Sequence, residues 1–315
     1  MTVAFPALAV RSLGVGLDVP WGSPQGFCTD DEGNDAPSQS LAGFLANHTH
    51  DMGHVFVSWQ PRSRATLDPD DYVHAWDALM QAIPANATRA LHHTALNLAH
   101  SNRYKRDALF AFTNALIERY DLAWVNEDLG YWSLDGKPLP YPLPPMLTDD
   151  GLAVAIDNVA ECQDRLRVPL LVEFPGFSRE WSLRLGPWDA YDFFREVVEQ
   201  TNSPCTLDTG HLLSWRWLQR HRGRALLGEL DRLPLDNTFE VHVSGAAVVN
   251  DAFHDTHDGV ILDLQVELLE RLIERCPNLQ AVTFEDPRLQ VDGTPEDSST
   301  HSVGRIRAAC SGWLA

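Results

Sequence analysis

The sequence is poor in basic residues and in cysteine, and it has no long hydrophobic run. Its 24 lysines and arginines stand against 44 aspartates and glutamates, which gives a net charge of −20 over 315 residues. Because this excess repels nucleic-acid phosphates and anionic lipids, we expect no nucleic acid and no membrane as partners. No apolar run reaches the roughly 18 residues of a membrane span, and no basic segment precedes the first apolar stretch. We therefore expect a cytoplasmic protein.

The five cysteines are odd in number and include no Cys-x-x-Cys pair. Such spacing indicates reduced thiols rather than a disulfide framework. Cys205 falls in an expected buried strand, so we interpret it as a small core side chain and not as a nucleophile.

What the sequence does contain is a dense set of metal-type ligands between His242 and Asp258. His242 ends a short apolar run, and Asp255 and His257 follow as an Asp-x-His pair. Imidazole suits iron and zinc, and a carboxylate offsets the charge of the ion, so this set is typical of a divalent metal site. A surface loop rich in Asp and His would have the same composition. The two interpretations differ in whether further ligands converge on the same place.

Further ligand-type residues follow other short apolar runs. They are His92, Glu127, Glu173, Asp208, His211 and Glu285. Buried strands that each lead to such a side chain at the carboxyl end are typical of a barrel whose active site lies at one face.

Strand and helix patterns alternate along the chain, which predicts parallel strands joined by crossover helices. We expect strands at residues 13–17, 54–59, 89–96, 122–127, 168–173, 204–208, 238–243 and 279–285. We expect amphipathic helices at residues 71–83, 107–120, 149–166, 188–200 and 262–275. The predicted fold class is α/β, a (β/α)8 TIM barrel in a single domain over residues 1–315.

Four other features have their own interpretations. Residues 18–45 and 130–147 are rich in glycine or proline and are expected to be long loops near the barrel mouth. The basic run 216–224 is expected on a helix after the sixth strand, as a solvated face rather than an anion site. His93 should point away from the ligand face, because successive side chains of a strand alternate.

Two acidic residues are candidates for catalytic roles. Glu127 could be a ligand or could orient one from a strand end. Asp258 could hold His257 by a hydrogen bond or could cap the helix that follows.

The order of several motifs resembles that of the DUF692 family, the multinuclear non-heme iron-dependent oxidative enzymes. The most specific motif is Asp-Thr-His-Asp at 255–258, which begins 13 residues after His242. Others are Leu-Gly-Val-Gly-Leu at 13–17, Leu-Pro-Tyr-Pro-Leu-Pro from 139, Leu-Val-Glu at 171–173 and Leu-Asp at 207–208. The resemblance extends from about Leu13 to Glu285.

The resemblance implies a xylose-isomerase-like TIM barrel with two or three iron ions at its mouth. Such enzymes use O2 as cosubstrate to modify a ribosomally made precursor peptide in natural-product biosynthesis, here at Cys or at Asp/Asn. They commonly act with a small leader-binding partner protein. By resemblance, Glu173 bridges two metals, His242, Asp208 and Glu285 complete one site, and His211, Asp255 and His257 hold another. His92 and Glu173 contribute to a third.

The sequence departs from the family pattern at several strand ends. Asn126-Glu127-Asp128 replaces the usual Ser-Glu-His, Glu173-Phe174 replaces Glu-Asn, and Asp208-Thr-Gly-His211 replaces Asp-x-Asn-Asn. His54 lies at the start of its strand, where the family usually has Glu-x-His near the end. The Asp-x-x-His at 208–211 is also similar to the endonuclease IV branch of the superfamily. A zinc- or manganese-dependent phosphodiesterase or sugar isomerase is therefore the alternative.

Overall fold

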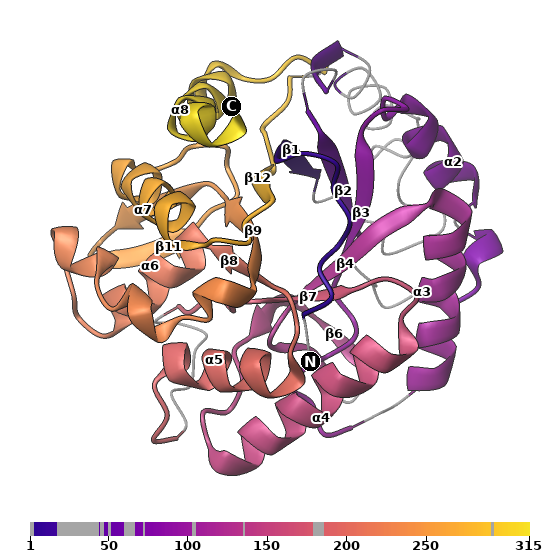
Figure 1. Cartoon of the computed structure of the whole chain (residues 1–315), viewed down its shortest axis with the longest axis horizontal. Coiled ribbons are helices and arrows are strands. Elements are labelled where there is room, and N and C mark those ends of the chain that lie inside the picture. The colour runs from indigo at the N-terminus through magenta and orange to yellow at the C-terminus, as the bar shows by residue number, and fades with distance from the viewer. Residues whose placement is uncertain are drawn as a thin grey trace.

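Eight parallel strands close into a barrel, as predicted (Figure 1). The computed structural model describes residues 3–17, 44, 47–49, 52–59, 67–71, 73–102, 105–134, 136–178, 186–290 and 293–315. The barrel strands are β1 (Ser12–Leu17), β2 (His54–Trp59), β3 (Thr88–His93), β4 (Leu122–Asp128), β7 (Leu170–Glu173), β8 (Cys205–Asp208), β9 (Thr238–Val243) and β12 (Ala281–Glu285). Each pairs with the next in parallel, and β1 pairs with β12 to close the ring.

All eight expected strands are present, and the largest difference in their bounds is at β3. This strand ends at His93 rather than at residue 96. The backbone N–H groups of Ala95, Leu96 and Asn97 donate to the Glu127 carboxylate instead of to a neighbouring strand. A buried side chain has therefore replaced the strand ladder as the hydrogen-bond acceptor for this segment.

Helices surround the barrel on the outside (Figure 1). They are α2 (Val73–Ala82), α3 (Arg106–Tyr120), α4 (Asp149–Arg165), α5 (Ala190–Thr201), α6 (Thr209–Leu218), α7 (Asp263–Arg275) and α8 (Asp297–Leu314), with short 3-10 turns η1 (Pro69–Asp71), η2 (Gly223–Leu227), η3 (Leu230–Arg232) and η4 (Leu235–Asn237). The start of α4 illustrates the local cause: the Thr148 side chain accepts from Gly151 N, and Asp149 and Asp150 follow at the positive end of the helix dipole. Within the described residues, no helix is long and apolar enough to cross a membrane.

Two antiparallel hairpins were not predicted. The first joins β5 (Tyr131–Leu134) to β6 (Lys137–Leu143), within the segment expected to be a loop, and the second joins β10 (Ala246–Val249) to β11 (Ala252–Asp255). The loop prediction for 130–147 was wrong because the prolines of β6 occupy every second position. Alternate residues of an antiparallel strand face its partner, so prolines at alternate positions leave the other N–H groups free to pair.

Two further predictions about connecting segments have different outcomes. The expected loop at 18–45 lies almost entirely outside the described residues. The basic run 216–224 is helical only as far as Leu218, and Arg220 has a left-handed backbone with φ of 70°. The expectation of one helix over the whole run was therefore wrong, since the chain turns after α6 and continues in η2.

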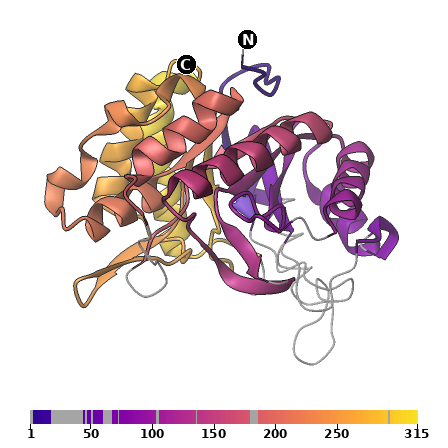
Figure 2. The same ribbon diagram turned by 90° about the horizontal axis from the view of Figure 1, so that it is seen from below.

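The lower end of the barrel is closed by packed side chains. Phe56, Ala90, Trp124, Leu171, Phe239 and Ala281 form an inner cluster, and the N-terminal residue Phe5 stacks on Phe239 with ring centroids 6.1 Å apart. Figure 2 shows the N-terminal segment on one side of the barrel and the β10–β11 hairpin on the opposite side. The interior is thus a filled core, which leaves the carboxyl ends of the strands as the face where a site can form.

Candidate metal centre

The carboxyl ends of the strands bring most of the predicted ligands together. Three groups of side chains place ligand atoms within 4.8 Å of one another. They are His211, Asp255 and His257; Glu173, His242 and Glu285; and His92, Asp128 and Glu173. Because parallel strands end at the same face, residues about 190 positions apart in the sequence meet at one place.

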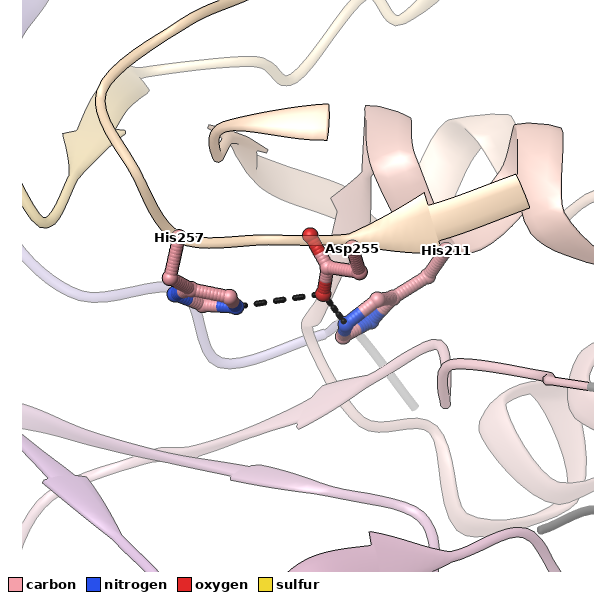
Figure 3. Close-up of side chains that lie close together, drawn as sticks. All are labelled: His211, Asp255 and His257. Carbon is pink, nitrogen blue, oxygen red and sulfur yellow. Dashed lines mark hydrogen bonds and ion pairs between the residues drawn. The ribbon is translucent and has the colours of Figure 1, made fainter. Parts of the chain in front are cut away.

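The first group contains two histidines around one aspartate (Figure 3). Asp255 Oδ2 lies 3.1 Å from His211 Nε2 and 3.1 Å from His257 Nε2. The other oxygen of Asp255 accepts a hydrogen bond of 2.6 Å from Ser244. Two imidazoles and one carboxylate are the ligand set typical of non-heme iron(II) sites that keep coordination positions open.

The rings of this group are oriented by acceptors on their far sides. His211 Nδ1 donates to the carbonyl oxygen of Phe174 over 2.7 Å, and His257 Nδ1 donates to Asp286 over 2.7 Å. Since a carbonyl oxygen and a carboxylate accept hydrogen bonds, these contacts favour a proton on each Nδ1. Each Nε2 is then free to act as a ligand, which is the usual arrangement around a metal-binding histidine.

Glu173 lies between the other two groups. Its Oε1 is 3.2 Å from His242 Nδ1, and its Oε2 is 3.2 Å from His92 Nε2. Asn126 donates to the same carboxylate and is itself held by Thr206 over 2.8 Å. Each oxygen of Glu173 therefore faces a different group, as a carboxylate that bridges two cations would.

Two buried carboxylates have oxygens that lack partners. Asp208 accepts from His211 N through Oδ1, but among the described residues its Oδ2 and the Oδ1 of Asp128 have no hydrogen-bond partner. Burial is the main cause that raises the pKa of Asp128 to about 7 and that of Asp208 to about 8. Buried anionic oxygens without donors are costly, and a bound cation would remove that cost, so the residues present fit a metal centre.

The carboxylates also change the histidines. Burial alone would lower the pKa of His92, but its hydrogen bond to Glu173 and the charges of Glu173, Asp128 and Glu285 raise it to about 9. The pKa values of His211, His242 and His257 are likewise raised by neighbouring carboxylates. In the metal-free protein, protons therefore occupy nitrogens that would bind metal.

We expect metal affinity to increase with pH up to about 9. Below the raised pKa, His92 retains a proton that a metal ion must displace, so affinity should fall about tenfold per pH unit for each proton released. Competition titration with a chromophoric chelator at about pH 6 and pH 8 measures this dependence. An affinity that is the same at both values would contradict it.

Comparison with known proteins identifies the family. Residues 67–289, more than two thirds of the chain, match the family described as "RiPP precursor modification enzyme MbnB/TglH/ChrH", RiPP being a ribosomally made and then modified peptide. The chain belongs to this family. The match confirms the resemblance seen in the sequence motifs, and it implies an enzyme that acts on a precursor peptide.

Curated relatives and solved structures agree with this. Two UPF0276 proteins of Caulobacter vibrioides are 25% identical over 214 residues, covering 68% of this chain and 73% of theirs, and 28% identical over 215 residues, covering 66% and 75%. A xylose isomerase-like TIM barrel protein from Mycobacterium smegmatis in complex with magnesium has a TM-score of 0.52 at 14% identity, covering 99% of this chain and 100% of its own. D-psicose 3-epimerase has a TM-score of 0.53 at 11% identity, covering 96% and 97%. These likenesses confirm the xylose-isomerase-like fold.

The departure of this MbnB/TglH/ChrH relative from the family's Ser-Glu-His motif now has a structural meaning. Asp128, in place of the histidine, lies 3.9 Å from His92 Nε2 and completes the group that the sequence had left with two members. Asp128 was not among the predicted ligands. The signal that could have found it is parity: Asn126 and Asp128 share one side of β4, and Asn126 contacts Glu173.

Glu127 is placed on the opposite side of β4, and its predicted role at the site was wrong. The same alternation turns its side chain away from the barrel interior, where the carboxylate accepts from three backbone N–H groups and contacts His93 Nδ1 at 3.0 Å. His93 also contacts Thr113, which confirms the prediction that it points away from the ligands. Glu127 therefore holds the loop after β3 and contacts none of the three groups.

We expect Glu127→Gln to destabilise the fold without removing metal. The amide loses one acceptor oxygen and turns an N–H₂ toward buried donors, which should lower the free energy of unfolding by about 1–3 kcal/mol. Chemical denaturation measures the first effect, and elemental analysis measures the second. Loss of metal in a folded Glu127→Gln protein would contradict this placement.

Asp258 has neither of its two predicted partners. Its Oδ1 accepts from Val260 N over 3.1 Å, whereas the Nδ1 of His257 is held by Asp286. Helix α7 begins at Asp263, beyond the reach of an Asp258 cap. The turn after β11 thus explains Asp258 locally, and Asp286 has the orienting role that the sequence assigned to it.

Glu240 is a buried carboxylate behind the centre that sequence reasoning did not identify. Its Oε1 lies 3.3 Å from His242 Nε2, on the side of the ring away from Glu173. It also accepts from Trp124 over 3.0 Å and from Thr283, which contacts His54 at 2.8 Å. His54 is thus deep in the barrel, in agreement with its position at the start of β2, and Glu240 fixes the orientation of His242.

We expect Glu240→Gln to weaken metal binding by about 10–100-fold, the usual effect of removing a carboxylate behind a ligating histidine. The substitution keeps the volume and leaves all ligand atoms in place. Competition titration against the unsubstituted protein measures the change. An unaltered affinity would mean that His242 is oriented by its other neighbours.

Proposed function

We propose that this enzyme uses several non-heme iron ions and O2 to oxidise a residue of a ribosomally made precursor peptide, at Cys or at Asp/Asn. Family membership supports the peptide substrate. The observation that carries the oxidative chemistry is the His211, Asp255 and His257 group, whose two imidazoles and one carboxylate suit an iron(II) site with open positions.

Charge balance supports two or three ions. Five carboxylates gather at the mouth, with four imidazoles among them: Asp128, Glu173, Asp208, Asp255 and Glu285, and His92, His211, His242 and His257. With neutral histidines, the five negative charges are close to the +4 of two ferrous ions and the +6 of three. A single divalent ion would leave most of this buried charge uncompensated.

The chain's own residues define where a peptide enters. The side chain of His257 is 34% exposed and that of Asp255 is 20% exposed, whereas His242 and Glu173 are buried. The peptide therefore reaches the first group from solvent, and Glu173 and His242 form the closed floor. Bound iron would supply the electrons that reduce O2.

The test uses protein loaded anaerobically with ferrous iron, together with the precursor peptide encoded beside its gene and any small leader-binding partner encoded there. We expect oxygen uptake and an altered peptide mass, both absent when zinc replaces iron. Oxygen-independent turnover of a phosphodiester or a sugar by the zinc or manganese form would instead favour the alternative hydrolase or isomerase.

A further inference from the structure

A second cavity lies beside the metal centre, against helix α6. It has a volume of about 570 Å³ and is lined by residues of the segment after β7, of α6 and the turn that follows it, and of the β10–β11 hairpin. The same elements carry the first metal group, since His211 is on α6 and Asp255 ends β11. The cavity is therefore fixed in position relative to the open side of the centre.

One wall of this cavity is aromatic. Trp217 packs on Phe253 with centroids 6.2 Å apart, and Phe177 packs on the buried Trp215 at 4.7 Å. Phe177 is further held by a hydrogen bond of 2.9 Å from its N–H to Ser214. These contacts give a rigid apolar surface that an incoming side chain could cover.

The rim of the cavity is cationic in a strongly acidic chain. Arg222 lies over the Trp217 ring at 3.9 Å and pairs with Asp251 at 3.3 Å. Arg220 is exposed at the rim, and no ion pair of its side chain occurs among the described residues. Two arginines and one aspartate leave one positive charge here, although the whole chain carries −20. A local cationic site against such a background favours an anionic group.

We propose that this cavity binds a carboxylate-bearing segment of the peptide substrate, with the carboxylate on Arg220 and a neighbouring apolar side chain against Trp217 and Phe253. This rests on the proposed function in taking a peptide as substrate. Arginine binds carboxylates in a two-pronged geometry, and aromatic walls with few polar groups are typical of peptide recognition. The basic run that the sequence indicated as a solvated face thus has a binding role. The carboxylate could belong to an acidic side chain or to a peptide C-terminus.

The test measures binding of a rhodamine-labelled peptide, Gly-Phe-Glu-Glu-Phe-Gly, to the full chain by fluorescence anisotropy in metal-free buffer. Three versions are compared: the C-terminal amide, the free acid, and the amide with both Glu replaced by Gln. We expect the Gln version to bind at least about fivefold more weakly, with a smaller difference at high salt. A fivefold gain for the free acid alone would assign the site to a C-terminus. Equal binding of all three versions would overturn the proposal.

Charge reversal at Arg220 tests the location. Arg220→Glu should weaken binding of the Glu peptide by about fivefold or more, whereas Arg224→Glu should change it by less than about twofold. Arg224 is the matched control, because its side chain is 81% exposed, belongs to the same basic run and pairs with Glu267 away from the cavity. Equal effects of the two variants would overturn the assignment. Binding that depends on Arg220 in a protein that consumes no oxygen would refute the proposed oxidation and leave this site standing.

Discussion

We expect Glu173→Gln to remove most of the bound metal and to reduce peptide oxidation by about 1,000-fold or more, beyond the 10–100-fold typical of residues that only support a ligand. Glu173 is the residue shared by two of the three groups, with one oxygen facing His242 and the other facing His92. A neutral amide has one acceptor oxygen and no charge, so it neither bridges two ions nor offsets their mutual repulsion. Elemental analysis of anaerobically loaded protein and peptide mass spectrometry measure the two effects.

The matched control for this experiment is Glu127→Gln. It makes the same chemical change at another fully buried glutamate, on the neighbouring strand but on the outer side of the sheet. The account predicts full metal content in Glu127→Gln and depleted metal in Glu173→Gln. Equal metal content in the two variants would show that Glu173 is a structural carboxylate like Glu127.

The second large effect is expected from Asp255→Asn. This substitution takes the only carboxylate out of the group formed with His211 and His257, while the barrel-floor groups retain all their members. We expect the loss of about one metal ion per chain and a fall in oxidation of about 100-fold or more, because the affected group is the one open to the peptide. Metal content per chain and oxygen uptake with peptide are the measurements.

Asp258→Asn is the matched comparison, three positions further along the same segment. Asp258 contacts Val260 N and none of the described metal groups, so its amide variant should retain metal and most of the activity. If Asp258→Asn abolished oxidation with its metal intact, Asp258 would be a catalytic group in its own right. If Asp255→Asn retained all its metal, the first group would not be a metal site.

The strands and the converging ligands were predictable because both depend on local patterns that the fold preserves. Each apolar run became a barrel strand, and the polar residue at its end met the others at the common face. Where side-chain alternation was applied, as for His93, the outcome was right. Where residue type alone was used, Glu127 was preferred over Asp128, although their places on β4 give the latter to the site.

Other features depend on contacts that no local pattern contains. Glu240 is important because β8, β9 and β12 bring it beneath His242 and beside Thr283, and its own position within an apolar strand gives no sign of this. The β5–β6 hairpin was missed since proline was read as a loop signal without regard to its spacing of two. Asp286 orients His257 across a separation of 29 residues in the sequence.

Anomalous X-ray scattering at the iron edge, from crystals of the protein loaded anaerobically with ferrous iron, tests the central claim most directly. The account predicts two or three iron peaks at the barrel mouth, each within about 2.5 Å of ligand atoms from the groups built on Glu173, His242, His92, Asp128, Glu285, His211, Asp255 and His257. Crystals with no iron peak at the mouth, or with iron bound only at the protein surface, would contradict it.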